Sequence, residues 1–269
     1  MRPLAFLLAA LHLMASGTSS SPQKTERTKV AEGEYAVIQR KSAGAVGPFE
    51  NEIYNFRESW TLWRTGDGGY EVTGERRFEA PQYVPHQNKF QARLAHDMSV
   101  LSVKEFAKLR WRPDSGPLAC DFLPGQLHCT SGGKDPGKAI LVDIPMKNPF
   151  GILWPMSPFS LNSVTREAGR RLNDVTPVQL IEMVEQSAEN PVSPLLLDGH
   201  LRYLGQEDVR IAKKRWHADK FEMTVPLHPG FVIWTSPDGI LLSLEVASDT
   251  KNEPAHRMDL VRYEKFADF

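Results

Sequence analysis

Apolar and polar residues alternate with period two along most of the chain. Tyr70, Val72 and Phe78 alternate with glutamate and threonine side chains, which is typical of a strand with one buried and one exposed face. Turn residues at 65–69 and 236–239 separate neighbouring segments of this kind. Further strands are expected at 34–39, 59–64, 91–101, 106–112, 118–123, 126–130, 138–144, 201–203, 207–213, 215–225, 231–235, 240–246 and 258–266.

The pattern changes between residues 148 and 190. Prolines at 149, 155 and 158 exclude a regular helix or a central strand there. The apolar side chains of this proline-rich segment are Phe150, Ile152, Leu153, Trp154, Met156 and Phe159. We expect the segment to lie over the sheet, either as a lid on a hydrophobic cavity or as a plug that completes the core.

Two helices are predicted after this segment. Leu161, Val164, Ala168 and Leu172 stand at helical spacing, although Gly169 weakens a helix at that point. The range 176–190 has the features of a second helix, because a threonine cap, a proline at the first helical position and a glutamine three residues on form a capping box.

These patterns predict a mainly β protein: a curved antiparallel sheet, or open β-barrel, with a short helical insert at 148–190 packed against it. We expect one domain over residues 31–269. Before it, residues 1–17 have a basic start, an apolar stretch and small residues near Gly17, which is the pattern of a cleaved secretory signal. Residues 18–30 are polar and are expected as a flexible leader. The protein is therefore expected to be periplasmic or secreted.

The two cysteines fit that compartment. Pro124-Gly125 is a strong turn signal between two alternating segments, and a hairpin centred there places Cys120 directly opposite Cys129. Opposed residues bring their Cβ atoms within disulfide range, so we predict a Cys120–Cys129 bond. A redox-active pair or half of a metal site are the alternatives, but neither has the spacing it needs.

Charge and motifs exclude several classes of function. With 32 basic and 33 acidic residues, the chain has no overall field that would attract nucleic acid. Residues 132–139 fit the G-x-x-x-x-G-K pattern of a phosphate-binding loop, but Ala139 stands where a serine or threonine would bind magnesium. The residues that follow are expected to form a strand, whereas a phosphate-binding loop leads into a helix. The basic clusters at 76–77, 170–171 and 213–215 are expected to be solvated. No cofactor, metal site or catalytic residue is predicted.

A segment near the C-terminus resembles a known group of proteins. The segment from Gly230 to Glu245, with its Trp234-Thr235-Ser236-Pro237-Asp238-Gly239 turn, together with 260–263, resembles bacterial periplasmic proteins built on an open β-barrel. These are an uncharacterised half-barrel family and, more distantly, the lipoprotein-carrier proteins. The resemblance implies a curved sheet whose open side is covered by helices and, in the carriers, a space that takes up acyl chains.

The leading functional hypothesis is an exported, non-enzymatic binding module for a lipid, an acylated protein or another apolar ligand. Its partner would be that hydrophobic ligand or an envelope protein, with no nucleic acid and no transmembrane span after signal cleavage. Two alternatives stay open: an envelope hydrolase whose site is assembled in space, and an assembly factor that uses an exposed strand edge.

Overall fold

A computed structural model describes residues 27–39, 56–78, 87–107, 118–131, 140–146, 150–154, 161–184, 193–211, 213–226, 230–246 and 256–269. The described residues form fifteen strands and one helix. In chain order the elements are β1 (Arg27–Gln39), β2 (Phe56–Thr65), β3 (Tyr70–Phe78), β4 (Gln87–Leu94), β5 (Val100–Ala107), β6 (Leu118–Leu123), β7 (Gln126–Ser131), β8 (Ile140–Pro145), β9 (Phe150–Trp154), α1 (Leu161–Glu167), β10 (Val175–Val184), β11 (Ser193–Ile211), β12 (Lys214–Thr224), β13 (Phe231–Thr235), β14 (Leu241–Val246) and β15 (His256–Lys265).

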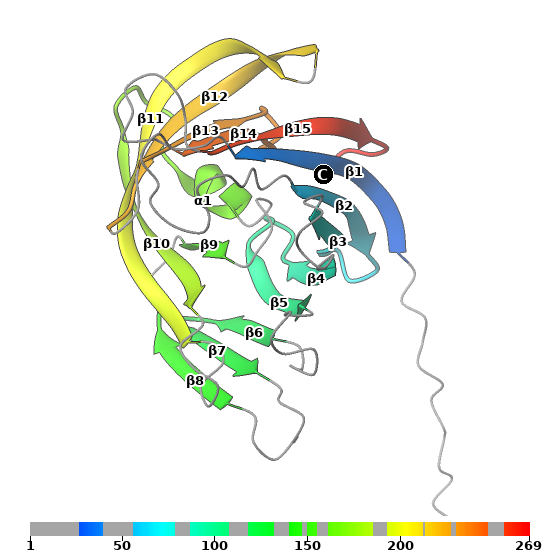
Figure 1. The fold of residues 1–269 in the computed structure, drawn as a ribbon, viewed down its shortest axis with the longest axis vertical. Helices are drawn as coiled ribbons and strands as arrows, with labels where there is room; N and C mark the ends of the chain where they lie inside the picture. The colour runs from blue at the N-terminus through cyan, green and yellow to red at the C-terminus, as the bar shows by residue number, and fades with distance from the viewer. Residues whose placement is uncertain are drawn as a thin grey trace, which may run out of the picture.

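All of these strands belong to one sheet, in the order β8-β7-β6-β5-β4-β3-β2-β1-β15-β14-β13-β12-β11-β10-β9. The sheet bends into an incomplete ring, with α1 and β9 on its inner side (Figure 1). Strands that follow each other in the chain pair as antiparallel neighbours, and β1 pairs with β15 in the middle of the sheet. The expected open sheet is therefore confirmed, with one parallel pair, β9 with β10, where α1 lies in the connection.

The ring is interrupted between β8 and β9. These strands are separated in the chain only by residues 146–149, yet β8 pairs with β7 and β9 with β10. Pro145 ends β8, and proline cannot donate a hydrogen bond to a neighbouring strand. We call this interruption the seam.

One face of the sheet is buried and forms the core. The fully buried side chains of greatest volume are Trp60, Tyr35, Phe221, Leu62, Leu127, Leu180, Ile181, Leu201, Ile211, Met223 and Ile233. Most of them alternate with exposed or half-buried positions along their strands, as the period-two pattern predicts, whereas Leu180 and Ile181 are adjacent and both buried. This buried face is called the inner face below.

The predicted helical insert is only partly correct. The first helix is present as α1, where Leu161 and Val164 are buried, but it ends at Glu167, so Leu172 lies beyond it and is exposed. The predicted second helix is wrong, because Val175–Val184 is strand β10. All ten residues of β10 pair with β11, and residues 179–182 also pair with β9. This pairing on both sides stabilises a strand, although the local sequence has the capping signal of a helix. Four consecutive buried residues, 178–181, are typical of a strand covered on both faces.

Two smaller boundaries also differ from expectation. The expected strand at 91–101 is interrupted after Leu94, where Asp97 accepts a hydrogen bond from the Ser99 backbone N–H at 2.9 Å and stabilises a turn. β1 begins at Arg27, so the last residues of the expected leader, 27–30, belong to the sheet. The rest of the expected leader and the signal lie outside the described residues.

Candidate functional site

Large aromatic side chains and glycines alternate across the inner face. Tyr263 of β15 lies opposite Gly33, Gly33 opposite Trp60, Trp60 opposite Gly74, and Gly74 opposite Phe90. Five neighbouring strands thus carry ring, glycine, ring, glycine, ring at one level. We call this set the aromatic row.

The glycines leave the space that the rings occupy. A Cβ atom at Gly33 would lie 2.5 Å from the Trp60 ring, and one at Gly74 would lie 2.1 Å from the Phe90 ring. Both distances are impossible for real atoms, so each ring lies across the glycine of the next strand and replaces the missing side chain. The aromatic row is therefore fixed in place.

A buried ion pair lies one level further along the same strands. Tyr35 is opposite Glu58, and Glu58 is opposite Arg76. The Nη2 and Nε atoms of Arg76 donate to Oε2 of Glu58 at 2.8 and 3.1 Å. The two side chains are 3% and 0% exposed. Charged residues this deeply buried contribute little net stability compared with apolar replacements, which favours a role in specificity.

Tyr35, beside this pair, and Tyr263, in the aromatic row, are held in the protonated form. Burial, followed by the charge of Glu58, raises the pKa of Tyr35 well above its ordinary value, and its hydroxyl donates to the Leu241 carbonyl at 3.0 Å. Burial also raises the pKa of Tyr263 to about 12. At neutral pH both phenols therefore stay protonated and do not act as bases, so the arrangement suits recognition better than proton transfer.

The hairpin of β11 and β12 covers one end of the aromatic row. Trp216 of β12 lies 6.0 Å from the Tyr263 ring, centroid to centroid, and Tyr263 lies 6.2 Å from Trp60. Tyr35 continues this chain of rings, at 6.2 Å from Trp60. Aromatic contacts therefore extend from the hairpin to the Glu58–Arg76 pair.

A second polar cluster attaches α1 to the sheet. Arg170, just after the helix, donates to the Thr165 and Ala168 carbonyls at 2.8 Å each and to Asp219 of β12 at 3.1 Å. Asp219 also accepts from the Tyr203 hydroxyl at 2.9 Å. Burial, followed by this bond, raises the pKa of Tyr203. We call this cluster the clamp, and its contacts are structural.

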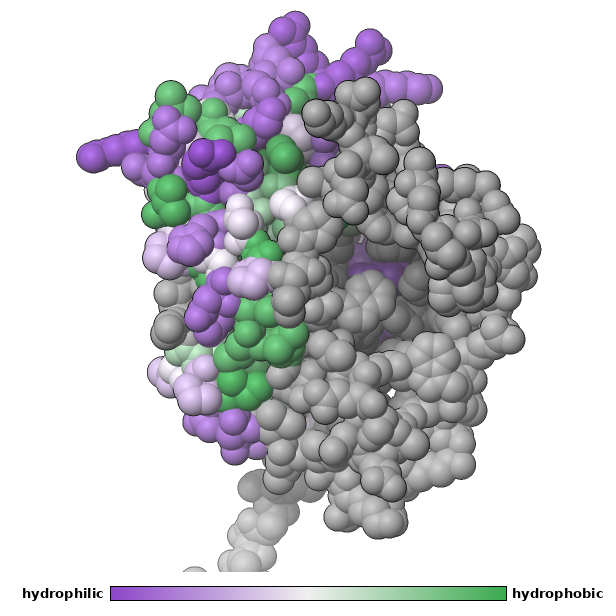
Figure 2. Space-filling view, turned by 60° about the vertical axis from the view of Figure 1, so that its left-hand side comes forward, coloured by the Kyte–Doolittle hydropathy of each residue, from purple (hydrophilic) through white to green (hydrophobic). Residues whose placement is uncertain are grey.

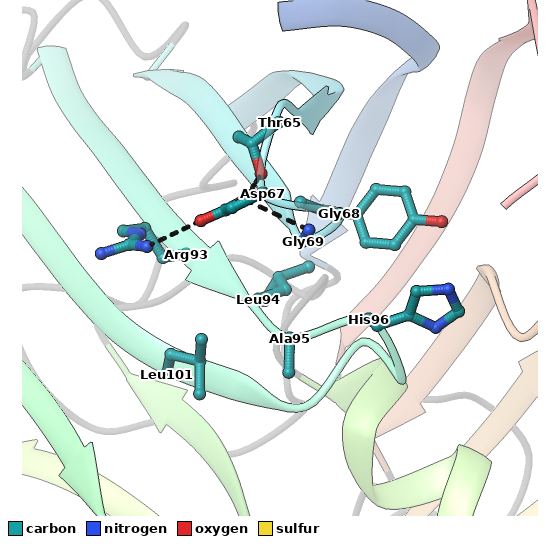
Figure 3. A pocket seen from close by; sticks show the side chains of 10 residues that line it. Thr65, Asp67, Gly68, Gly69, Arg93, Leu94, Ala95, His96 and Leu101 are labelled. Atoms are coloured by element: carbon teal, nitrogen blue, oxygen red, sulfur yellow. Dashed lines mark hydrogen bonds and ion pairs between the residues drawn. The ribbon is translucent and has the colours of Figure 1, made fainter. Parts of the chain in front are cut away.

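A shallow pocket of about 240 Å³, with both polar and apolar lining, lies between the β2–β3 turn and the β4–β5 loop (Figure 3). Asp67 accepts from the Thr65 hydroxyl, from the Gly69 N–H at 3.3 Å and from Arg93 at 3.4 Å. These contacts, led by the Thr65 bond, lower the pKa of Asp67. The carboxylate is thus used by its own turn, and the His96 ring projects away from it.

The predicted disulfide is present. Cys120 and Cys129 are directly opposed in the β6–β7 hairpin, with their Cα atoms 4.1 Å apart, and they form a bond. Of the predicted lid or plug, Phe150, Ile152, Leu153 and Trp154 form the edge strand β9, while Met156 and Phe159 lie outside the described residues. The expectation of a lid or plug stays a prediction.

Other expectations have mixed outcomes. The phosphate-loop imitation at 132–139 lies outside the described residues. The assignment of residues 76–77 to a solvated cluster is wrong for Arg76, which is buried against Glu58, and correct for exposed Arg77. Within the described ranges, no three His, Cys, Asp or Glu side chains come together in a way that would hold a metal ion. The one helix in the described part of the chain is not long and apolar enough to cross a membrane.

The Glu58–Arg76 pair was missed by sequence reasoning, although the signal was present. Arg76 is in phase with Tyr70 and Val72, and Glu58 is in phase with Trp60 and Leu62, so period two alone points both charges inward. Two opposite charges on the buried faces of adjacent strands predict a buried pair. Only the register of β2 with β3, which the structure supplies, shows that they meet.

Comparison with known proteins addresses the fold. No protein-family model and no curated protein matches the chain. The structure is similar to the crystal structure of a beta-barrel-like protein of a domain of unknown function, DUF1849, from Brucella abortus. The TM-score is 0.50 at 8% identity, and the match covers 88% of this chain and 98% of that one. At this identity the likeness concerns the fold alone, and it supports the expected resemblance to uncharacterised open-barrel proteins but not to lipoprotein carriers.

Proposed function

We propose that this protein is a non-enzymatic binding module that takes an apolar or amphipathic ligand, such as a lipid or an acylated protein, against the inner face of its sheet. The observation that carries the proposal is the seam. Elsewhere in the described sheet, strands that follow each other in the chain pair, so the seam is where the ring is open. The apolar, proline-rich segment predicted as a lid or plug begins there as β9.

The inner face has the chemistry that such a ligand needs. Its aliphatic and aromatic side chains suit an acyl chain, and larger open barrels in general enclose ligand cavities. The Glu58–Arg76 pair is the charged point of this face, but its two side chains satisfy each other, and the Tyr35 hydroxyl beside it donates to the Leu241 carbonyl. The proposal therefore rests on the apolar side chains, which suit the apolar part of a ligand.

The proposal also includes a cellular location and a functional similarity to other proteins. We place the protein in the periplasm or outside the cell because the sequence at 1–17 has the signal pattern and because the disulfide suits an oxidising compartment. A functional likeness to lipoprotein carriers belongs to this proposal. Mass spectrometry of protein purified from its host should find an N-terminus near Thr18, and an intact Met1 would contradict export.

Organic extraction of the native protein, followed by lipid mass spectrometry, tests ligand binding. We expect a bound lipid, and we expect Trp154→Ala to reduce its amount more than it lowers the melting temperature. The matched control is Trp63→Ala on the outer face of β2, where the indole N–H donates to the Thr73 hydroxyl at 3.1 Å. The control should keep the lipid.

The plug interpretation predicts the reverse result. If the segment only fills the core, Trp154→Ala should cost several kcal/mol, on the order of 3–5, as large-to-small core changes do. A lipid-free extract together with that loss would remove the carrier function.

One observation favours the assembly-factor alternative. In the described sheet β8 pairs only with β7, and β9 only with β10, so both strands are sheet edges that can accept a partner strand. Backbone-amide exchange of β8 and β9 distinguishes the two functions. A partner strand would protect these edges, whereas a lipid would leave their exchange unchanged.

A further inference from the structure

The end of the β11–β12 hairpin extends beyond the rest of the sheet. β12 pairs with β13 only from Asp219 to Met223, whereas β11 and β12 remain paired with each other as far as Ile211 and Lys214. The register shifts between Tyr203 and Gly205, where the ribbon bends. From the pair Glu207–Ala218 onward the hairpin is two strands wide, and it forms the top of the molecule in Figure 1.

Four exposed basic side chains gather at this tip: Arg210, Lys213, Lys214 and Arg215. Figure 2 shows hydrophilic side chains projecting from the same end of the molecule. Arg210 and Arg215 are directly opposed across the two strands. Like charges in that position destabilise a hairpin, so folding alone does not account for them.

The acidic residues nearby are already engaged. Asp208 accepts from Arg215 at 2.6 Å and lies 3.1 Å from the Nδ1 atom of His217. Glu207 accepts from the Trp234 indole at 2.6 Å and pairs with Lys220 at 3.0 Å. In the described part of the chain, Arg210, Lys213 and Lys214 form no ion pair, and the Lys214 ammonium lies 4.0 Å from the centroid of the Trp216 ring.

We propose that this basic hairpin tip docks on the anionic phosphate surface of a phospholipid membrane. The tip is convex and projects from the body, so its cations can reach several headgroups of a flat surface at once. Single-stranded nucleic acid would need aromatic rings on which to stack, but Trp216 is half-buried against Tyr263. Each lysine or arginine brought to an anionic surface strengthens binding about five-fold.

Docking in this way would set the orientation of the molecule. The hairpin covers the end of the aromatic row through Trp216 and Tyr263, so that end of the sheet would face the lipid. The docking proposal rests on the charges of the tip and does not require a ligand inside the sheet. Membrane docking and ligand binding can therefore be contradicted independently of each other.

Vesicle flotation of the full-length folded chain tests the proposal. Vesicles of phosphatidylglycerol and phosphatidylcholine in equal parts should bind the protein, and pure phosphatidylcholine vesicles should bind it far less. The triple variant Arg210→Gln, Lys213→Gln, Lys214→Gln should lose about 100-fold in partition coefficient, from three charges of about five-fold each. Raising the salt concentration should weaken wild-type binding through screening.

The matched control removes one arginine and two lysines elsewhere. Lys89, Arg93 and Lys104 are exposed on β4 and β5, so changing all three to glutamine alters net charge equally without touching the tip. This control should keep more than half of the wild-type binding free energy. Circular dichroism melting should show both triple variants folded, since all six side chains are exposed.

Three results would overturn the proposal. The first is equal binding of wild type and tip variant to the anionic vesicles, and the second is equal binding of wild type to both vesicle types. The third is displacement by inorganic phosphate well beyond that by sodium chloride of the same ionic strength, which would indicate a site for a single free anion.

Discussion

The β6–β8 end of the sheet is built of strands six residues long, whereas β10, β11 and β12 at the other end have ten, nineteen and eleven residues. The short end carries the Cys120–Cys129 disulfide, and the long end carries the clamp between Arg170, Asp219 and Tyr203. The end built of short strands is thus reinforced covalently. The end with long strands, next to the five-residue edge strand β9, is held by packing, with polar contacts that position α1.

The largest expected effect is on the long end. Phe221 is fully buried and packs against Tyr203 at 5.3 Å, so Phe221→Ala should lower the free energy of unfolding by about 3–5 kcal/mol. Phe122→Ala on the short end should cost less, because that ring is 9% exposed. Urea unfolding of both variants measures this. An equal or larger loss at Phe122 would mean that the short end also depends mainly on packing.

Removing the disulfide should have the next largest effect. Replacing Cys120 and Cys129 by serine opens a loop of sequence separation 9 and should cost about 2–3 kcal/mol in the chain-entropy model. Amide exchange should rise in β6–β8 and not in β10–β12. A reductant should bring the wild type to the level of the variant and leave the variant unchanged. Faster exchange in β11 and β12 would show that the two ends are coupled.

Weakening the clamp should cost less. Asp219→Asn removes the charge that Arg170 contacts while keeping an acceptor for Tyr203, so we expect a loss of about 1–2 kcal/mol with faster exchange around α1. Asp208→Asn at the exposed hairpin tip is the control and should change stability by less than about 0.5 kcal/mol. If both variants behave alike, α1 is held by its apolar contacts alone.

The smallest expected effect is the contribution of Tyr263 to stability at alkaline pH. Tyr263 has a pKa raised to about 12 by burial, whereas a tyrosine in the unfolded chain ionises near about 10. Between these values the unfolded chain binds fewer protons, so stability is complete below the lower pKa and falls as pH rises through the upper one. Tyr263→Phe should reduce this fall by on the order of 1 kcal/mol, because Tyr263 is only partly buried. An unchanged slope would place the ionisation at another residue.

Much of the fold follows from local patterns. Period two predicted most strands, and the Pro124-Gly125 turn predicted the pairing of Cys120 with Cys129. β10 was mistaken for a helix because a short apolar run with a capping signal fits either state, and its pairing with β9 and β11 decides between them. The candidate site was less predictable. The aromatic row and the Glu58–Arg76 pair depend on register across strands, which no single segment specifies.

The pairing of β1 with β15 has a consequence for how the chain is made. A chain synthesised from its N-terminus can pair β1 with β2 and extend towards β8 as each strand appears. The other edge of β1, in the middle of the final sheet, must wait for β15, the last of the described strands. Such distant contacts form slowly, and an unpaired edge attracts other chains. During synthesis the protein therefore has an unpaired strand edge at the centre of its future sheet until β15 is complete.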